Sequence, residues 1–364
     1  MTKSVRIQSV DILRGITIIA MILVNNPGSW SHVYAPLLHA EWHGLTPTDL
    51  VFPFFLFIVG ISIFYAYKSK TASKSTYKKI TIRSLKLIGL GLFLKVFTPF
   101  FPFVISWEAI RFPGVLQRIG VVFFITAVLY LNCNWKVLLG VTISILIGYW
   151  LLLGFTPLPN GIEPTFERAA NNWCNYVDLK LFGTHMWKPD YDPEGFLSTI
   201  SSIATCLIGV LVAKILDSGI LQKHIVLFVL GGFLLALGYL FSIWFPINKA
   251  LWSSSFVLVS AGYATLVLAV IYVIVDVKQW HFGGVFKQVG MNAITIYFLS
   301  GFIAKCFYKI PLGNSTIHSW LYQTIYVYDW MPPKLSSLLY ALTVVAFYVG
   351  LGHFLYRKKI FIKV

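Results

Sequence analysis

Long apolar stretches recur along the whole chain, and a shorter polar segment separates each one from the next. A helix rises about 1.5 Å per residue, so an apolar run of roughly 18 to 22 residues crosses a hydrocarbon core of about 30 Å. The pattern therefore predicts ten membrane-spanning helices. Their expected positions are residues 9–27, 49–67, 83–101, 114–132, 136–155, 196–216, 223–244, 252–275, 286–306 and 336–356.

The composition supports a membrane protein without a soluble domain. Hydrophobic residues make up 57% of the 364 residues and charged residues only 12%, whereas average soluble proteins are about half apolar and a quarter charged. No repeat or low-complexity tract divides the chain. We therefore expect residues 1–364 to form a single domain, an all-α, polytopic integral membrane helical bundle.

The net charge of +16 is divided unevenly between the two sides of the predicted bundle. With ten spans, the ends and connections on one side carry most of the Lys and Arg residues, including the run from Lys68 to Lys86. The positive-inside rule then places both termini in the cytoplasm and the segment around His39 outside. We expect a multi-pass protein of the inner (plasma) membrane that attracts anionic membrane lipids and needs no nucleic acid to explain its charge.

The polar segment between the first two spans holds more titratable groups than a turn requires, namely His39, Glu41, His43 and Asp49. Ionisable residues at membrane depth are functional hypotheses. A neutral imidazole can accept a proton, and a carboxylate bonded to its other nitrogen fixes its tautomer. His39 is the expected general base, and each of the other three residues is able to orient it. The alternative is that these side chains only satisfy backbone groups of the loop.

Two asparagines within or beside the spans need hydrogen-bond partners. Asn25 ends the first span, where it either caps the helix or points into a cavity beside His39. Asn292 lies in an apolar stretch and requires either another helix or a substrate hydroxyl. HAEWH spaces two histidines like one helix face, but it lacks the glutamate placement of the zinc protease motif, so we expect no metal site.

Charged residues near the helix ends have structural alternatives as well. Arg118 lies about one turn inside its span and requires an anion, either a carboxylate such as Glu108 or Asp49 or the phosphate of a ligand. Asp192 and Glu194 stand just before a helix, where carboxylates suit the positive N-terminus. We favour capping over catalysis for these two residues.

Three connections on the predicted outer side are long and rich in aromatic residues. They are residues 28–48, 156–195 and 307–335. Aromatic side chains of this kind suit the membrane interface, and together the three connections are long enough to cover a cavity.

Six motifs of the chain follow one another in the order of a known family. They are SVDILRG, MILVNNPG, HAEWHGLTPTDLVFPFFLFIVG, GVLQRIG, YDPEGFLSTI and GMNAITIYF. Over essentially its whole length the chain resembles the heparan-alpha-glucosaminide N-acetyltransferase family, and it looks like a compact bacterial member. The resemblance implies an enzyme that moves an acetyl group from cytosolic acetyl-CoA to the amino group of a terminal glucosamine across the bilayer, and it suggests a homodimer.

The resemblance also assigns candidate roles to individual residues. The family's active histidine carries over to His39, whereas His43 stands where the family often has asparagine. The implied catalytic residues are His39, Asn25 and Asp49, and Asn25 or Asn292 is a candidate donor to the developing oxyanion. The candidates for substrate binding are Glu41, Trp42, His43, Asp192, Glu194 and Asn292, and those for the phosphates of CoA are Arg118, Arg83 and Lys86.

Two other functions stay open at the level of the sequence. Some bacterial relatives carry a sugar-transporter label, so an amino-sugar or N-acetylglucosamine transporter is one alternative. An O-acyltransferase that modifies envelope polysaccharide is the other.

Overall fold

The computed structural model describes residues 7–159 and 161–362, and nearly all of its regular structure is helical. The long helices are α1 (Gln8–Asn25), α2 (Val51–Tyr67), α3 (Lys74–Val96), α4 (Val115–Asn132), α5 (Trp135–Phe155), α7 (Phe196–Asp217), α8 (Lys223–Phe241), α9 (Ser254–Tyr272), α11 (Ala293–Lys309) and α13 (Pro333–Arg357). The shorter elements are α6 (Trp173–Phe182), α10 (Gly284–Gly290), α12 (Ile317–Tyr326), four single turns (Ala35–Leu37, Pro47–Leu50, Trp107–Ala109 and Val273–Val277) and a two-stranded hairpin of β1 (Pro311–Leu312) and β2 (Ser315–Thr316).

The prediction of an all-helical, multi-pass membrane protein is confirmed. Each of the ten predicted spans contains a helix. Eight helices within the described residues are long and apolar enough to cross a membrane, and the bent pair α10 and α11 makes a ninth if it counts as one span. The two terminal segments, residues 1–6 and 363–364, are outside the described residues. The cytoplasmic placement of both termini therefore stays a prediction.

Two of the predicted spans differ from the observed helices. The helix predicted at residues 83–101 begins at Lys74, where the Ser73 side chain accepts from the backbone N–H of Thr76, and it ends at Val96. Its first thirteen residues include Lys74, Lys78, Lys79, Arg83 and Lys86. A search for long apolar stretches does not detect a helix that begins with so many charges. The span predicted at residues 286–306 is broken by a bend of 77° between α10 and α11.

The bend lies beside Asn292, whose side-chain amide bonds the chain that follows α13. The Nδ2 group of Asn292 donates to the backbone carbonyl of Ile360 over 3.0 Å, and its Oδ1 atom accepts from the backbone N–H of Ile362 over 2.9 Å. Asn292 therefore holds the chain that follows α13 against the break.

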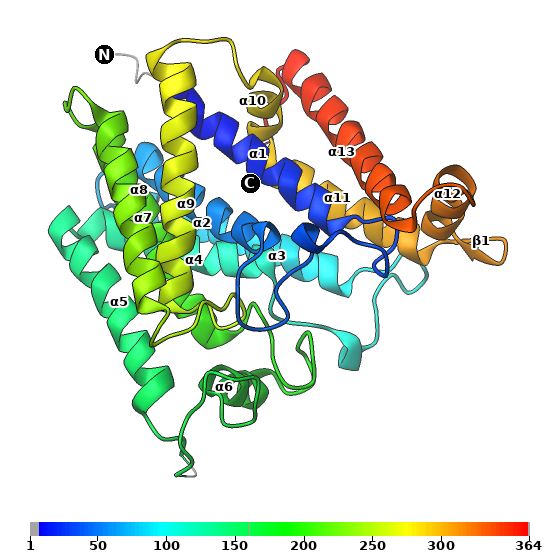
Figure 1. Cartoon of the computed structure of the whole chain (residues 1–364), viewed down its shortest axis with the longest axis horizontal. Coiled ribbons are helices and arrows are strands. Elements are labelled where there is room, and N and C mark those ends of the chain that lie inside the picture. The colour runs from blue at the N-terminus through cyan, green and yellow to red at the C-terminus, as the bar shows by residue number, and fades with distance from the viewer. Residues whose placement is uncertain (1–6, 160, 363–364) are drawn as a thin grey trace.

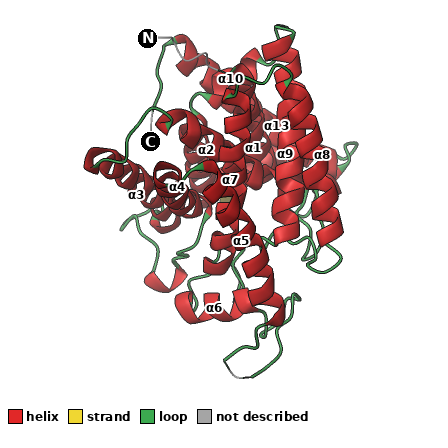
Figure 2. Ribbon diagram, turned by 90° about the vertical axis from the view of Figure 1, so that its left-hand side faces the viewer, coloured by secondary structure: helices red, strands yellow, loops and turns green. Residues whose placement is uncertain are grey.

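α7 is the most buried span of the bundle, while α8 and α13 are the most exposed. α7 packs against α2, α4, α5 and α9, and α8 and α9 form an antiparallel pair beside it (Figures 1 and 2). The contact between α2 and α7 depends on glycine. A Cβ atom added at Gly60 would lie 1.9 Å from the carbonyl oxygen of Cys206, and one added at Gly209 would lie 2.0 Å from that of Phe57.

The connections 26–46, 97–114, 156–195 and 242–253 all leave helices at the same end of the bundle, which we call the loop end. α6 and the coils around it form the lower part of the molecule in Figures 1 and 2. Of the three long connections expected to cover one cavity, residues 28–48 and 156–195 meet here. Residues 307–335 instead form the hairpin and α12, which pack beside α11 and α13.

We expect Gly209→Ala to destabilise the protein, because the added methyl group overlaps the backbone of α2 and forces the two helices apart. Overpacking of this kind costs about 1 to 3 kcal/mol. Thermal unfolding in detergent measures the change. Gly148→Ala on α5 is the control, since no atom lies within 4 Å of a Cβ atom added there, and equal melting temperatures for the two variants would contradict this account.

Candidate active site

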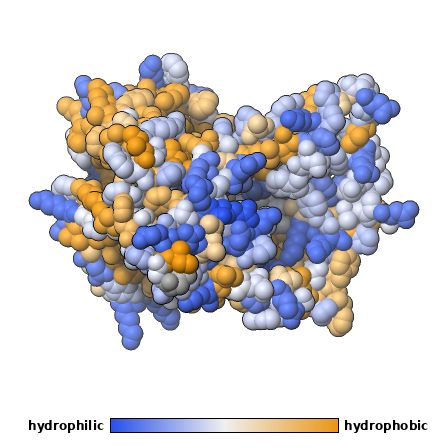
Figure 3. Space-filling model, turned by 60° about the horizontal axis from the view of Figure 1, so that its bottom comes forward, coloured by the Kyte–Doolittle hydropathy of each residue, from blue (hydrophilic) through white to orange (hydrophobic). Residues whose placement is uncertain are grey.

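A cavity of about 390 Å³ lies at the loop end, between the connections and the ends of α1, α2, α4 and α11. Figure 3 shows this face of the molecule, with hydrophilic side chains gathered around a hollow. The polar groups that line the cavity include Asn25, His39, Glu41, Asp49, Glu194 and Lys249. Four of the titratable residues predicted from the sequence, His39, Glu41, Asp49 and Glu194, therefore face one space.

His39 and Asp49 form the closest polar pair in the cavity. The Nδ1 atom of His39 lies 2.7 Å from the Oδ1 atom of Asp49. A carboxylate can only accept, so Nδ1 donates the proton and Nε2 keeps its lone pair. Half of the His39 side chain is exposed, at 51%, whereas that of Asp49 is buried, at 1%. Of the three residues that the sequence offered as partners of His39, the structure places Asp49 in this position.

The local sequence TPTD explains how Asp49 is held. Thr46 precedes a short turn, Pro47 enters it, and the Thr46 and Asp49 side chains cap each other's backbone. The Oδ2 atom of Asp49 accepts from the backbone N–H of Ala40 over 3.1 Å and from that of Thr46 over 3.0 Å. One carboxylate oxygen thus closes the loop, which leaves the other oxygen for His39.

Lys249 completes this group, although it was not singled out from the sequence. Its Nζ atom lies 3.0 Å from Nδ1 and 3.2 Å from Nε2 of His39, and 3.7 Å from Oδ1 of Asp49. The connection between α8 and α9 holds it, because the side chain of Asn248 accepts from the backbone N–H of Leu251 over 2.8 Å. Burial lowers the pKa of Lys249, and the carboxylates of Asp49 and Glu194 oppose that shift.

The position of Lys249 in the sequence could have marked it as a candidate site residue. Lys249 stands in INKALW, a polar group in a short connection between two strongly apolar stretches, which is the same signal that selected His39. Nothing in the sequence, however, shows that residues 39 and 249 meet.

A second charged group forms the opposite wall of the cavity. Arg111 donates through Nε to Asp192 over 2.7 Å and also binds Glu194. Its guanidinium lies 5.2 Å from the centre of the Trp187 ring. Burial alone would raise the pKa of Glu194, but Arg111, Arg118 and Lys249 together hold it below its usual range. Glu194 therefore presents a negative charge to the cavity, which suits a cationic group of a substrate.

Capping of α7 by Asp192 or Glu194 was the favoured interpretation of the sequence, and it is wrong. The backbone N–H of Phe196 donates instead to Asp178 of α6, over 2.7 Å. Burial raises the pKa of Asp178 to about 7. A Cβ atom added at Gly195 would lie 1.7 Å from the Asp178 carboxylate, so this approach requires glycine.

Arg118 is buried beside this cap and does not line the cavity. It donates to the hydroxyl of Thr199 over 3.1 Å, to the carbonyl of Gly195 over 3.2 Å and to the hydroxyl of Ser198. The expectation of a direct carboxylate partner, Glu108 or Asp49, is wrong, because neutral oxygens at the start of α7 accept from the guanidinium. Its suggested contact with a phosphate stays a prediction.

Of the other residues predicted from the segment 25–43, three line the cavity and His43 does not. Asn25 and Glu41 line it, as does Trp42, whose indole N–H donates to the carbonyl of Phe166 over 2.9 Å. His43 points elsewhere. Its Nε2 atom lies 3.2 Å from Glu167 and its Nδ1 atom 3.2 Å from the amide of Asn248.

Asn292, Arg83 and Lys86 do not line the cavity. The amide of Asn292 is occupied at both ends by the chain after α13, as described above, so the predicted contact with a substrate hydroxyl has no basis here. The guanidinium of Arg83 lies 4.8 Å from the centre of the Phe123 ring, and Lys86 is exposed on the same helix. Their role toward CoA phosphates stays a prediction.

A second cavity of about 330 Å³ adjoins the first and shares Arg111, Val115 and Tyr297 with it. Lys95 and Lys305 also line it, and the ammonium of Lys305 donates to the carbonyl of Leu94 at the end of α3 over 2.9 Å. The space beyond Arg111 is therefore cationic.

The arrangement suits proton transfer. The imidazole is oriented by a buried carboxylate, has one nitrogen, Nε2, that carries no proton of its own, and faces a cavity large enough for a small molecule. Among the described residues, no group of three or more His, Cys, Asp or Glu side chains is placed to hold a metal ion.

Comparison with known proteins assigns the chain to a family. The profile of the family described as "Heparan-alpha-glucosaminide N-acetyltransferase, catalytic" matches residues 6–217, which include His39 and Asp49. The chain belongs to this family. Heparan-alpha-glucosaminide N-acetyltransferase from Homo sapiens is 31% identical over 99% of the chain, and the Mus musculus protein is 30% identical over the same share.

The family match has a limited extent. The chain spans about 60% of the length of the human and mouse relatives. Lys249 lies outside the range matched by the heparan-alpha-glucosaminide N-acetyltransferase profile, so its place beside His39 rests on the structure.

We expect Arg111→Gln to destabilise the protein strongly, because it leaves Asp192 and Glu194 buried without their cation. Breaking a buried ion pair costs about 3 to 5 kcal/mol. Arg168→Gln is the matched control, since the Arg168 side chain is 42% exposed against 13% for Arg111, and exposed pairs contribute about 0 to 1 kcal/mol. Thermal unfolding of both variants checks the difference, and equal losses would refute it.

Proposed function

We propose that this chain is a transmembrane acetyltransferase that transfers an acetyl group from acetyl-CoA to the amino group of a glucosamine-type sugar. The observation that carries the proposal is the group of His39, Asp49 and Lys249 in an open cavity at the loop end. The names of the related proteins support the amino acceptor. The distribution of Lys and Arg favours a loop end that faces outside, as in a bacterial plasma membrane.

His39 acts as the general base in this proposal. An amine attacks a thioester only as the free base, and Nε2 of His39 accepts its proton before or during the attack. Asp49 holds Nδ1–H and stabilises the imidazolium that forms. The tetrahedral intermediate then expels the thiolate of CoA, to which His39 returns the proton. General base catalysis of this kind contributes about 10² to 10⁴-fold to the rate.

Lys249 has two roles in the same scheme. In the resting site its ammonium lies 3.0 Å from Nδ1 and 3.2 Å from Nε2 of His39, where it occupies the place of the acceptor's amine. When the amine of the acceptor takes that position, the flexible lysine side chain is free to donate to the oxyanion of the intermediate. Asn25, which lines the same cavity, is the second candidate donor. Such preorganised donors contribute about 10² to 10³-fold each.

The remaining walls of the cavity suit a sugar with a positive charge. Glu41 and Glu194 line it and attract a protonated amine. Trp42, Trp187 and Tyr191 provide aromatic surface, and the rings of Trp42 and Tyr191 pack edge to face at 5.3 Å. Apolar walls with a few placed polar groups are the usual composition of small-molecule sites.

The function is tested with purified protein in liposomes, with labelled acetyl-CoA on one side and glucosamine on the other. We expect acetylated glucosamine from the wild type. His39→Ala should lose at least about 10²-fold in rate, because the base is removed. His43→Ala is the matched control and should keep most of the rate, since the ring of His43 bonds Glu167 and Asn248 instead of Asp49.

The same experiment separates the alternatives. A sugar transporter predicts that glucosamine accumulates in liposomes without acetyl-CoA. An O-acyltransferase predicts that a sugar without an amino group is acetylated as fast as glucosamine. A wild type that acetylates no sugar, or a His39→Ala variant with the full rate, would overturn the proposal.

The role of Lys249 predicts a particular dependence on pH. Because burial lowers the pKa of Lys249, the ammonium is present at low pH and is lost as the pH rises, so the rate should fall on the alkaline side. Lys249→Met should lose about 10² to 10³-fold at the pH values where the wild type keeps the ammonium, and the difference should shrink above the alkaline fall. Lys249→Arg should keep part of the rate and move the alkaline fall to higher pH, because a guanidinium stays charged.

The measurement is the pH profile of acetyl transfer for both variants and the wild type. Lys188→Met serves as the control, because Lys188 is exposed and does not line the cavity. Identical alkaline limbs in the wild type and Lys249→Arg would exclude Lys249 as the group that titrates.

A further inference from the structure

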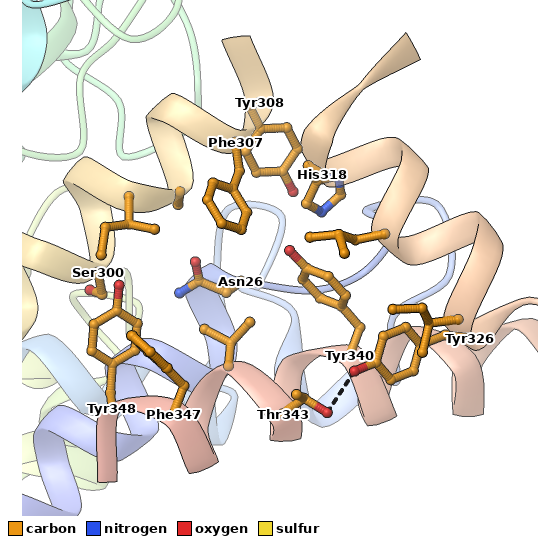
Figure 4. Close-up of a pocket in the computed structure, with 15 residues that line it drawn as sticks. Asn26, Ser300, Phe307, Tyr308, His318, Tyr326, Tyr340, Thr343, Phe347 and Tyr348 are labelled. Carbon is orange, nitrogen blue, oxygen red and sulfur yellow. Dashed lines mark hydrogen bonds between the residues drawn. The ribbon is translucent and has the colours of Figure 1, made fainter. Parts of the chain in front are cut away.

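A separate pocket of about 290 Å³ lies between α11, α12, α13 and the end of α1 (Figure 4). It shares no residue with the cavity at His39, and the last turn of α1 divides the two. Asn25 lines the catalytic cavity, and the next residue, Asn26, lines this pocket. The proposed acetyl transfer makes no use of it.

The walls of the pocket are mainly apolar and border the lipid. Ile303 and Phe307 of α11, Leu321 and Ile325 of α12 and Phe347 of α13 contribute to them. Phe347 is 59% exposed and Ile325 is 48% exposed on the apolar surface of the bundle. A hydrocarbon chain can therefore enter the pocket from the membrane without passing through water.

One polar atom in these walls is buried and unused. His318 is 7% exposed, and its Nε2 atom has no hydrogen-bond partner among the described residues. The ring is held in place, since it stacks on Tyr308 with a centroid distance of 3.9 Å and meets the ring of Tyr340 at 5.0 Å. In Figure 4 the rings of His318 and Tyr340 project into the same space.

The hydrogen bond that Nδ1 of His318 makes determines whether Nε2 is a donor or an acceptor. The ring bonds the backbone of Pro27, and because proline has no N–H, its carbonyl accepts and Nδ1 is the donor. Burial lowers the pKa of His318, so the ring is neutral. A neutral imidazole that donates through Nδ1 has a bare lone pair at Nε2. What is missing at this position is a hydrogen-bond donor.

We propose that this pocket binds a lipid alcohol, a molecule with one apolar chain and a free hydroxyl group, and that the hydroxyl donates to Nε2 of His318. The chain fills the space lined by α11, α12 and α13. The hydroxyl of Tyr340 lies beside the same position and is able to donate to the oxygen of the ligand.

Water alone fits the pocket less well than an alcohol does. A water molecule at Nε2 would have the Tyr340 hydroxyl as a second partner, but it would leave the apolar walls around Ile303, Leu321 and Phe347 unfilled. An alkane would fill those walls but leave Nε2 without a donor, and an unmade hydrogen bond in an apolar site is unfavourable. An alcohol satisfies both parts of the pocket.

The test uses the full chain in phosphatidylcholine nanodiscs and a photoreactive twelve-carbon alcohol that carries a diazirine and an alkyne. We expect labelling of peptides from residues 300–308, 317–326 and 340–348. Dodecanol should compete for the label about ten-fold better than dodecane, because a net hydrogen bond of this kind is worth about that factor.

Three variants decide the origin of the label. His318→Phe keeps a stacked ring but removes the acceptor, so it should still be labelled and should lose the ten-fold preference for the alcohol. Ala304→Phe fills the pocket and should lose the labelling. His353→Phe is the matched control, because His353 lies on α13 outside the pocket and bonds Gln288 over 2.9 Å.

The outcomes are separable from the fate of the proposed acetyl transfer, since no substrate of that reaction is present. Equal competition by dodecane and dodecanol in the wild type would overturn the proposal. Full labelling of Ala304→Phe, or an unchanged preference in His318→Phe, would overturn it as well. Melting temperatures equal to that of His353→Phe show that the two pocket variants are folded.

Discussion

The buried carboxylate of Asp49 is the interaction on which the loop end depends. One of its oxygens accepts from the backbone at Ala40 and Thr46 and so closes the loop that carries His39. The other faces His39 and the ammonium of Lys249. A buried charge is stable only when it is paired and hydrogen-bonded, and these partners come from two separate connections. A single group thereby holds the loop that carries His39, the proposed base itself and the connection between α8 and α9 in one place.

The other walls of the cavity are fixed by a second set of buried charges. Arg111 ties the connection before α4 to Asp192 and Glu194 at the start of α7. The first turn of α7 is bonded by Asp178 of α6, which only glycine at position 195 allows. Because α7 is also the most buried span, the mouth of the cavity is attached to the centre of the bundle. Rigid support of this kind keeps an imidazole at a fixed distance and angle from a bound substrate.

Sequence reasoning located the helices and selected a polar segment that lines the cavity at the loop end. It failed where hydrogen-bond partners lie far away along the chain. Apolar length located a helix at each of the ten predicted positions, and eight or nine of the helices in the described residues are long and apolar enough to span the membrane. The charged start of α3 and the bend beside Asn292 escaped this search, since an apolar window ignores polar groups. Arg118 was expected to meet either a carboxylate or a ligand phosphate, whereas its Nε and Nη2 groups donate to oxygens at the start of α7 and its Nη1 group has no partner among the described residues. The N-terminus of α7 was expected to be capped by Asp192 or Glu194, its neighbours in sequence. The carboxylate that accepts from this N-terminus is instead Asp178 of α6.

The amino-acid sequence by itself determined the fold class, the membrane setting, the family and the choice of His39, because these depend on composition, on periodicity and on short motifs. Only the tertiary structure decided which residue orients His39, that Lys249 stands beside it and that Asn292 holds the end of the chain. It alone showed the unused nitrogen of His318 in an apolar pocket. The physical reason is that hydrogen bonds and ion pairs act over about 3 Å, and contacts between residues as far apart as 39 and 249 arise only when the helices pack.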